Sequence, residues 1–207
     1  SATTDGTATL TVTKATPAIG VLSDLSKTFG DADFNLANPS ATPTGGTWSY
    51  DSASPSVAII SGNTISIIGA GTSIITATYT PAIGDQGNYQ TATTSFTLTV
   101  SASSQTISVS TTTANMGTTT VLRTSGSSGT GAITFSKVSG PCTVASDGTL
   151  TPSGVGTCVV TATIAADSSF ASATSAQKSI SINPLSRTLS FTTTTYNKVY
   201  GSTQTVT

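Results

Sequence analysis

The sequence predicts an all-β protein made of tandem β-sandwiches, and three observations lead to this prediction. One motif occurs twice, apolar and hydroxyl side chains alternate along most of the chain, and turn signals come at short intervals. Threonine alone is roughly a fifth of the chain, far above ordinary usage. Because its side chain is β-branched, threonine fits a pleated strand better than a helix. No stretch shows convincing helical spacing.

The repeated motif is a Gly-x-Gly-Thr turn followed by a β-branched strand that contains Thr-Ala-Thr. It occurs at Ile67–Pro81 as IIGAGTSIITATYTP and at Ser153–Asp167 as SGVGTCVVTATIAAD, an offset of 85 residues (156 − 71). Upstream, SKTFG at Ser26–Gly30 is answered by ANMG at Ala114–Gly117 and by NKVYG at 197–201. Because a repeat of this length is one structural unit, we expect two whole units and the opening of a third.

The repeat divides the chain into four segments. Residues 1–13 are expected to be the closing strand of a preceding repeat, since their TATLTV resembles SFTLTV at Ser95–Val100. Residues 14–101 and 102–184 are expected to form one unit each, and residues 185–207 the opening strands of a further repeat. The joins are only a few residues long, so they should hold neighbouring units end to end. The chain is thus expected to be a segment of a longer array.

Alternation and turns within each unit specify short antiparallel strands. In TLTV at Thr97–Val100 and SISI at Ser179–Ile182, apolar residues face one way and hydroxyl residues the other, as in a half-buried strand. Turns such as SGNT at Ser61–Thr64 and SDGT at Ser146–Thr149 place Gly or Asn where a positive φ is needed. About seven short strands in ~85 residues are typical of a β-sandwich.

Composition excludes several classes of partner. Charged residues are 7% of the chain, the net charge is −1, and 36% of residues are hydrophobic. Without a basic surface, the phosphate attraction needed for nucleic-acid binding is missing, and so is attraction to anionic lipid. No apolar run approaches the ~18 residues of a membrane span, so we expect no membrane insertion in this segment. The apolar content suits several small cores rather than one large core.

Ser54–Tyr79, SPSVAIISGNTISIIGAGTSIITATY, resembles the signature of bacterial immunoglobulin-like repeats of group 2. A Ser-Pro-Ser-Val-Ala strand, a Gly-Asn turn and a Gly-x-Gly-Thr turn lead into an Ile-Thr-Ala-Thr strand. The second unit is similar at Cys142–Thr163, CTVASDGTLTPSGVGTCVVTAT, but carries two cysteines and a longer Ser/Gly loop. The resemblance implies an immunoglobulin-like sandwich and a place in stalks of extracellular adhesins, other large surface proteins, or phage tails and capsids.

Cys142 and Cys158 are the only cysteines and are expected to form a disulfide within the second unit. The bridge would close a loop of about 17 residues and stabilise the unit by ~3 kcal/mol. Two free buried thiols are the alternative. A zinc site would need four ligands, yet the chain has no histidine. A redox Cys-x-x-Cys motif is absent too. The disulfide implies an oxidising compartment, so the protein is expected to be secreted and exposed at an extracellular surface.

Catalytic and metal-binding residues are scarce. With no histidine and no glutamate, the only side-chain carboxylates are eight aspartates, and an aspartate-pair hydrolase would need two of them to converge in a cleft. The closest pair, Asp31 and Asp33 in FGDADF, is a candidate calcium site, although calcium takes six to eight oxygens. A solvated loop between two strands is the alternative. We expect no catalytic residue, cofactor or metal.

Trp48 and Tyr50 in GGTWSY are candidate ligand-binding residues. Two residues apart on a strand, they share one face. Burial between the sheets is favoured, because aromatic side chains offer the largest apolar area to a small sandwich; a sugar-stacking platform is the alternative. Phe135 is expected to occupy a place in the second unit similar to that of Trp48. Tyr89 and Phe170 also correspond, and should fix the loop before the last strand.

Two functional hypotheses follow. In the first, the chain is a non-catalytic spacer in a secreted, surface-exposed, adhesin-like stalk. Its partners are then neighbouring repeats, while host-surface or glycan ligands are bound by domains elsewhere. In the second, it is a subunit of an extracellular filament or phage virion surface, in which other copies of the chain complete the incomplete ends by strand complementation. Carbohydrate binding through Trp48 is a third hypothesis.

Overall fold

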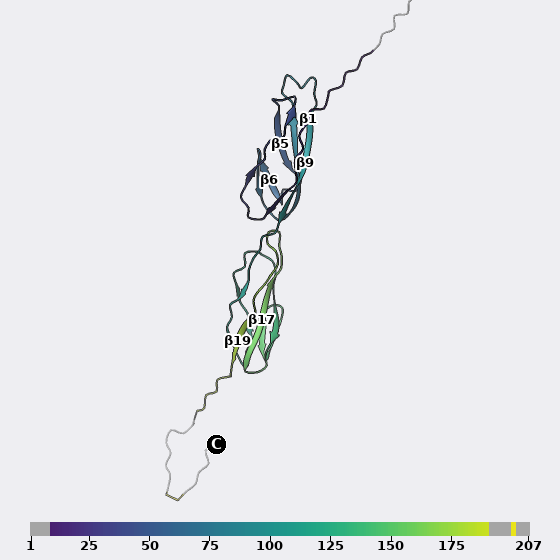
Figure 1. Cartoon of the computed structure of the whole chain (residues 1–207). Coiled ribbons are helices and arrows are strands. Elements are labelled where there is room, and N and C mark those ends of the chain that lie inside the picture. The colour runs from purple at the N-terminus through teal and green to yellow at the C-terminus, as the bar shows by residue number, and fades with distance from the viewer. Residues whose placement is uncertain (1–8, 191–199, 202–207) are drawn as a thin grey trace, which may run out of the picture.

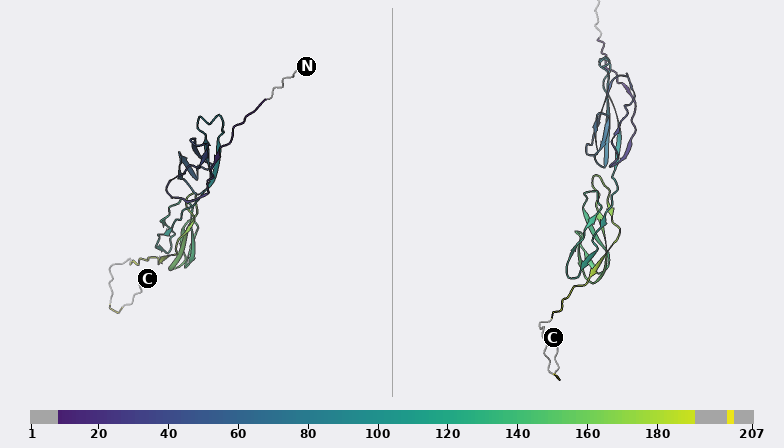
Figure 2. Two further views of the ribbon diagram at one scale, coloured as in Figure 1. Left: turned by 45° about the horizontal axis from the view of Figure 1, so that its top comes forward. Right: turned by 90° about the vertical axis from the view of Figure 1, so that its left-hand side faces the viewer.

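The computed structural model describes residues 9–190 and 200–201, and its strands form two β-sandwiches that follow one another along the chain (Figure 1). Strands β1 to β9 make the first sandwich and β10 to β19 the second. Views from other directions also show two elongated bodies end to end (Figure 2). Every regular element among the described residues is a strand, as the sequence predicts, and none of these residues belongs to a helix that could cross a membrane.

The first sandwich consists of a four-stranded sheet, a three-stranded sheet and one further strand pair. Their orders are β2-β9-β8-β5, β3-β7-β6 and β1-β4. The strands are β1 (Ala18–Ile19), β2 (Leu25–Thr28), β3 (Phe34–Asn35), β4 (Ala41–Thr42), β5 (Thr47–Ser52), β6 (Ala58–Ser61), β7 (Thr64–Ile67), β8 (Gly71–Thr80) and β9 (Ala92–Ser101).

The second sandwich repeats this topology strand for strand. Its orders are β11-β19-β17-β14, β12-β16-β15 and β10-β13, and the additional β18 pairs with β17. The strands are β10 (Ser108–Val109), β11 (Thr113–Asn115), β12 (Thr120–Val121), β13 (Thr124–Ser125), β14 (Ile133–Ser139), β15 (Cys142–Val144), β16 (Thr149–Pro152), β17 (Gly156–Ile164), β18 (Ala173–Thr174) and β19 (Lys178–Asn183). The chain is therefore a tandem of immunoglobulin-like sandwiches.

In each sandwich the opening strand lies parallel to the closing strand. β2 pairs with β9 in parallel, from Leu25 beside Leu98 to Thr28 beside Ser101, and β11 pairs with β19 in the same sense. The other strand pairs described are antiparallel. As a result, the chain enters a sandwich at one end and leaves it at the other.

The predicted alternation places apolar side chains between the sheets. On β9, Phe96, Leu98 and Val100 are buried, and they pack with residues of the three-stranded sheet such as Ile65. In the second sandwich a separate core forms around Leu150, which is fully buried. The two clusters share no residue, so each sandwich has a core of its own. Burying one such side chain contributes about 1.5–3 kcal/mol.

One predicted strand begins later than the sequence pattern indicates. The Ser-Pro-Ser-Val-Ala segment forms a turn up to Val57, whose N–H donates to the carbonyl of Ser54 at 2.9 Å, and β6 starts only at Ala58. Pro55 lies within this turn and has no N–H to give to a strand ladder. The proline therefore delays the strand.

Candidate functional site: the junction between the sandwiches

Asp31 and Asp33 are used separately, each in a local hydrogen bond. The Oδ2 atom of Asp31 accepts from the backbone N–H of Thr28 at 3.0 Å, which closes the turn after β2. The Oδ2 atom of Asp33 accepts from the hydroxyl of Ser66 at 2.7 Å, across to β7. In the part of the chain that the structure describes, no three His, Cys, Asp or Glu side chains gather as metal ligands would.

Trp48 and Tyr50 lie half-buried on the same face of β5. Trp48 stands opposite Tyr79 of β8, with the two ring centroids 5.2 Å apart. The hydroxyl of Tyr50 donates to Oδ1 of Asn38 at 2.9 Å, and burial raises the pKa of this phenol. Both rings are thus occupied within the first sandwich.

The expected correspondence between Phe135 and Trp48 is wrong. Phe135 pairs with Ala162 as Tyr50 pairs with Ala77, so Phe135 takes the place of Tyr50. The counterpart of Trp48 is Ile133. The 85-residue offset of the repeated motif likewise matches Phe135 with Tyr50 and Ile133 with Trp48.

Tyr79 has a role that the sequence analysis missed. Its side chain is 1% exposed, its hydroxyl donates to the carbonyl of Pro43 at 2.6 Å, and the N–H of Gly46 donates to it at 3.0 Å. These two bonds tie residues 43–46 to the end of β8. The signal in the sequence is a bulky phenol in the strand position where the second unit has Ile164.

The predicted disulfide joins Cys142 to Cys158, whose Cα atoms are 5.9 Å apart. Cys142 lies on β15 and Cys158 on β17, so the bond links the two sheets of the second sandwich. Both residues are buried in its core. The bridge is therefore a core element of one sandwich and takes no part in the contact between them.

The two sandwiches contact each other through the loop after β17. The N–H of Ala70, in the turn before β8, donates to the carbonyl of Ser168 at 2.6 Å. Phe29, just after β2, meets Phe170 edge to face, with ring centroids 5.5 Å apart and planes inclined at 74°. An aromatic pair in this geometry contributes about 0.5–1.5 kcal/mol beyond its burial. These contacts cross from one sandwich to the other, and we call this region the junction.

The linker is hydrogen-bonded on both sides of the junction. Ser101, the last residue of β9, accepts from the N–H of Phe29 at 2.9 Å, which anchors the start of the linker in the first sandwich. Ser103 donates its N–H to Ser169 and accepts from the N–H of Ala171, each at 2.9 Å, which holds it to the second. The few residues between β9 and β10 consequently have little freedom to bend.

Asp167 fixes the loop that forms the junction. Its Oδ1 accepts from the backbone N–H groups of Ser169 and Phe170, both at 2.8 Å, and its Oδ2 accepts from the N–H of Thr130 at 2.7 Å and from its hydroxyl at 3.2 Å. The backbone N–H groups of Thr130, Ser169 and Phe170 favour the charged carboxylate and lower the pKa of Asp167 to about 2. The loop is thus held from within while its outer face meets the first sandwich.

Gln105 connects the linker to two loops of the second sandwich. Its Nε2 donates to the carbonyl of Ala171 at 2.8 Å, and its Oε1 accepts from the N–H of Gly129 at 2.9 Å. One side chain thus holds the linker, the loop before β14 and the loop after β17 together.

Gly69 shows why the repeated turn needs its first glycine at the junction. Gly69 is buried, and a Cβ atom there would lie 2.7 Å from the carbonyl oxygen of Ser56 and 3.2 Å from that of Ser168. A side chain would therefore clash with the backbone of its own sandwich and also crowd the carbonyl of the neighbouring one. The sequence predicts a turn here, but nothing local to the motif shows that a neighbouring sandwich rests on it.

Two shallow cavities flank Pro81 and Gln86 at the far end of the first sandwich. Their volumes are about 340 and 380 Å³, and threonine, proline, glycine and glutamine provide most of their lining. The one charged residue among the lining residues is Lys14. With no carboxylate in either lining, these cavities lack an acid and base pair, and the junction remains the candidate functional site.

No protein-family model and no curated protein matches the sequence. Among solved structures, the chain is similar to Drosophila N-cadherin EC1-4, with a TM-score of 0.42 and 9% identity over 84% of this chain and 50% of that one. It is also similar to the four N-terminal Ig domains of Dscam1 isoform 6.9, with a TM-score of 0.39 and 13% identity over 85% and 47%. A third is surface layer protein SbsC, domains 1-6, with a TM-score of 0.33 and 16% identity over 68% and 20%. The chain spans half or less of the length of these structures. Because the TM-scores are low, the fold assignment rests on the strand topology alone.

Proposed function

We propose that the chain is a non-catalytic spacer segment of a secreted, adhesin-like surface stalk built from sandwiches of the bacterial group-2 immunoglobulin-like type. In this proposal, residues 14–101 and 102–184 are complete repeats. Residues 1–13 close a preceding repeat and residues 185–207 open a following one; of these, residues 1–8, 191–199 and 202–207 lie outside the described part of the chain. Ligands at the tip of the stalk are bound by other domains, and this segment sets their distance from the cell.

The junction is the observation that carries the proposal. A spacer has to keep its units in line, and the linker here is hydrogen-bonded to both sandwiches while Phe29 and Phe170 are in contact across the boundary. Long Gly/Ser tethers would instead allow free rotation between units. The Cys142–Cys158 bond supports an extracellular location, because disulfides persist in oxidising compartments.

The parallel opening and closing strands suit a segment that bears tension. Pulling on the two ends of a sandwich drives β2 and β9 in opposite directions along their lengths. The hydrogen bonds between Leu25–Thr28 and Leu98–Ser101 are then loaded together rather than one after another. A stalk that holds a cell against flow requires this kind of resistance.

Single-molecule stretching of the chain from its two ends tests this role. We expect two separate unfolding events, one for each sandwich. Unfolding of the second sandwich should lengthen the chain by about 5 nm less than its residue count allows, because the 16-residue separation closed by the disulfide cannot extend. Reductant should restore the missing length. Unfolding without a resolved barrier in either sandwich would contradict a load-bearing spacer.

Assembly between chains is a second candidate function, and the segment Thr9–Thr13 favours it. Leu10 and Val12 are 87% and 83% exposed. They align with Leu98 and Val100, which are buried in β9. A segment with this alternation and an uncovered apolar side can add as a strand to another sheet by strand complementation.

Native mass spectrometry of the chain separates the two candidates. Assembly by strand complementation predicts oligomers that dissociate when Leu10 and Val12 are both replaced by serine. The spacer proposal predicts a monomer with and without these substitutions. A matched control, Thr11→Ser, should have no effect in either case because it leaves the apolar side unchanged.

A further inference from the structure

The free end of the second sandwich repeats the part that the first sandwich contributes to the junction. Phe29 follows β2 and donates its N–H to Ser101, while Met116 follows β11 and donates its N–H to Asn183, both at 2.9 Å. Each side chain is half-buried and packs against the core of its own sandwich. Met116 therefore stands where Phe29 stands in the junction.

The turn before the long strand repeats in the same way. Gly69 and Gly154 precede Gly71 and Gly156, whose φ angles are +141° and +142°. At the junction Gly69 is buried because the neighbouring sandwich covers it, whereas Gly154 is only partly buried. Val155, the counterpart of Ala70, has a side chain that is 60% exposed.

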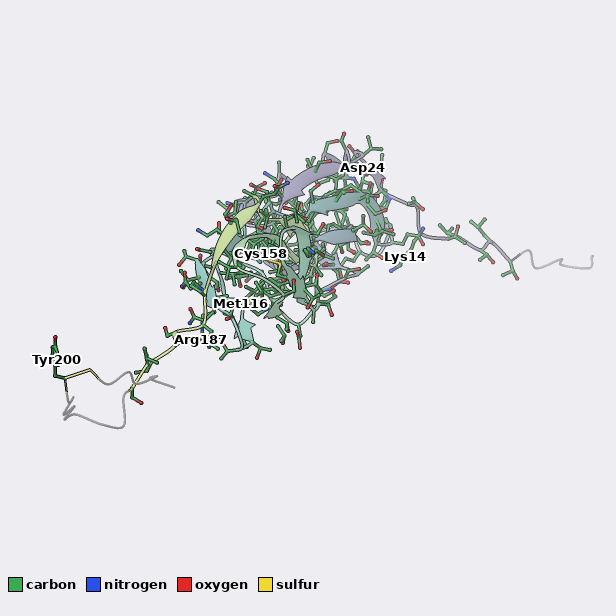
Figure 3. All side chains as sticks on the ribbon, turned by 90° about the horizontal axis from the view of Figure 1, so that it is seen from below. Lys14, Asp24, Met116, Cys158, Arg187 and Tyr200 are labelled. Carbon is green, nitrogen blue, oxygen red and sulfur yellow. A yellow bond between two sulfur atoms is a disulfide. The ribbon has the colours of Figure 1, made fainter. Side chains whose placement is uncertain are left out.

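The linker supplies the third matching element. Leu185 follows Asn183 by two residues, as Ser103 follows Ser101, and its side chain is 62% exposed. Between Met116 and Leu185 lies a shallow cavity of about 280 Å³, lined by Asn115, Met116, Thr118, Pro184, Leu185 and Ser186. In Figure 3, Met116 lies at the end of the molecule from which the chain leaves towards Arg187.

We propose that Met116, Val155 and Leu185 form a docking site, here called the distal socket, for the next immunoglobulin-like unit of a longer chain. The occupant is a loop like that at Asp167–Phe170. Its carbonyl accepts from the N–H of Val155, and its aromatic ring packs on Met116. This inference rests on the proposed repeat function and specifies how each repeat recognises the one that follows it.

The chemistry of the distal socket fits this occupant. A methionine sulfur makes favourable contacts with an aromatic ring, so Met116 can replace Phe29 as the partner of a ring. The glycine at position 154 leaves room for an approaching carbonyl, as Gly69 does at the junction. Leu189 is 81% exposed, whereas its counterpart Ile107 is buried in the second sandwich. The segment after the socket thus has an apolar residue where the next unit needs one.

A three-unit chain tests the inference. Residues 104–190 are appended directly after Leu185, in place of 186–207, so that Leu185 takes the position of Ser103 before the added copy. Only the first 185 residues are labelled with ¹⁵N, and amide exchange is measured by NMR in the extended and the original chain. The amide of Ala70 reports on the existing junction, and that of Val155 on the distal socket.

We expect exchange at Val155 to slow by about tenfold on extension, as an added hydrogen bond of ordinary strength predicts, while Ala70 stays protected in both chains. Unchanged exchange at Val155 with Ala70 protected would overturn the distal socket and leave the proposed spacer function standing. If Ala70 were unprotected as well, the junction itself would be wrong, and both proposals would fall.

Two variants guard against an effect of chain length alone. Phe170→Ser in the appended copy removes the ring that should meet Met116, and Met116→Ser in the labelled part removes the surface that the ring contacts. In each variant, amide exchange at Val155 should speed up again, most of the way to the rate measured in the original chain. Thr174→Ser in the appended copy is the matched control, since it lies on β18 outside the contact, and it should leave the protection in place. Protection that survived both of the first two variants would contradict the proposed contact.

Discussion

The two sandwiches share one topology but differ in chemistry at the place where the second has its disulfide. Cys142 pairs with Pro152 as Ala58 pairs with Ile67, so Ala58 is the counterpart of Cys142. Ser73 is the counterpart of Cys158. Where the second sandwich has a disulfide, the first has a small buried alanine and a serine that is 2% exposed.

The serine is satisfied by local hydrogen bonds instead of a covalent bond. The Ser73 hydroxyl is 2.9 Å from that of Ser52 and accepts from the N–H of Ser54 at 3.1 Å. The first sandwich also has Trp48, Tyr50 and Tyr79 on β5 and β8, whereas β14 and β17 of the second have one aromatic side chain, Phe135. The comparison teaches that a large aromatic contribution to the core and a covalent bond are alternative ways to stabilise one small fold.

Converting the bridge of the second sandwich into its counterpart in the first should have the largest effect. The double substitution Cys142→Ala with Cys158→Ser should lower the unfolding free energy of the second sandwich by about 3 kcal/mol, because the unfolded chain is no longer constrained. Calorimetry checks the size of the effect. Trp48, the chain's single tryptophan, reports the first sandwich by its fluorescence. An equal shift of the Trp48 transition would contradict the assignment of the bridge to one sandwich.

A second substitution removes an interaction that only the first sandwich has, the hydrogen bonds of the buried Tyr79 hydroxyl. Tyr79→Phe deletes the buried hydroxyl that bonds Pro43 and Gly46, so it should lower the free energy of unfolding of the first sandwich by about 1–3 kcal/mol. Urea unfolding followed by Trp48 fluorescence measures the loss. Ile164→Val, at the matching position of the second sandwich, is the control and should leave the Trp48 transition unchanged. A loss well below 1 kcal/mol would mean that water replaces the phenol.

Acid should weaken the second sandwich, with a smaller effect. The pKa of Asp167 is about 2 in the folded chain, below its usual value, and backbone and side-chain bonds to Thr149 also lower the pKa of Asp147. A lowered pKa means that the folded state binds the proton less readily than the unfolded state. The stabilisation is therefore complete above about pH 4 and is lost as the pH falls towards 2.

Thermal unfolding between pH 5 and pH 2 measures this dependence. Asp167→Asn should flatten the pH dependence, because an amide is neutral and takes up no proton on acidification. Asp147→Asn should flatten it less, since Asp147 closes only its own turn through the N–H of Thr149 at 2.8 Å. A pH profile that is unchanged by Asp167→Asn would show that the carboxylate does not stabilise the folded loop.

Most of the fold could be predicted from the sequence because alternation and turn residues, which are local patterns, determine the strands. Alternation in Thr97–Val100 and Ser179–Ile182 places the same residues in the core that the structure buries. The glycines of the two hairpin turns, Gly62 and Gly148, have the expected positive φ. Strand boundaries could not be predicted as well, because a proline such as Pro55 changes a single turn and leaves the alternation of apolar residues around it unchanged.

The junction could not be predicted in the same way. Phe29 and Ala70 lie in one unit and Ser168 in the other, and all three are far apart in the sequence, so no local pattern connects them. Asp167 has the two local hydrogen bonds of an aspartate in a turn, to Ser169 and Phe170, and the other two form only because Thr130 lies beside it. Residue type alone makes Trp48, Asp31 and Asp33 candidate ligand residues, and residue type does not reveal a contact made largely by backbone atoms.

The parallel pairing of opening and closing strands also determines when a unit can fold during synthesis. β2 is made early, but its neighbour β9 is the last strand of the same unit to leave the ribosome. Until then the four-stranded sheet has a gap between β2 and β8, and pairings between distant parts of a chain form slowly. A unit therefore cannot complete its four-stranded sheet before its last strand is available, so its sheet forms as a whole rather than strand by strand.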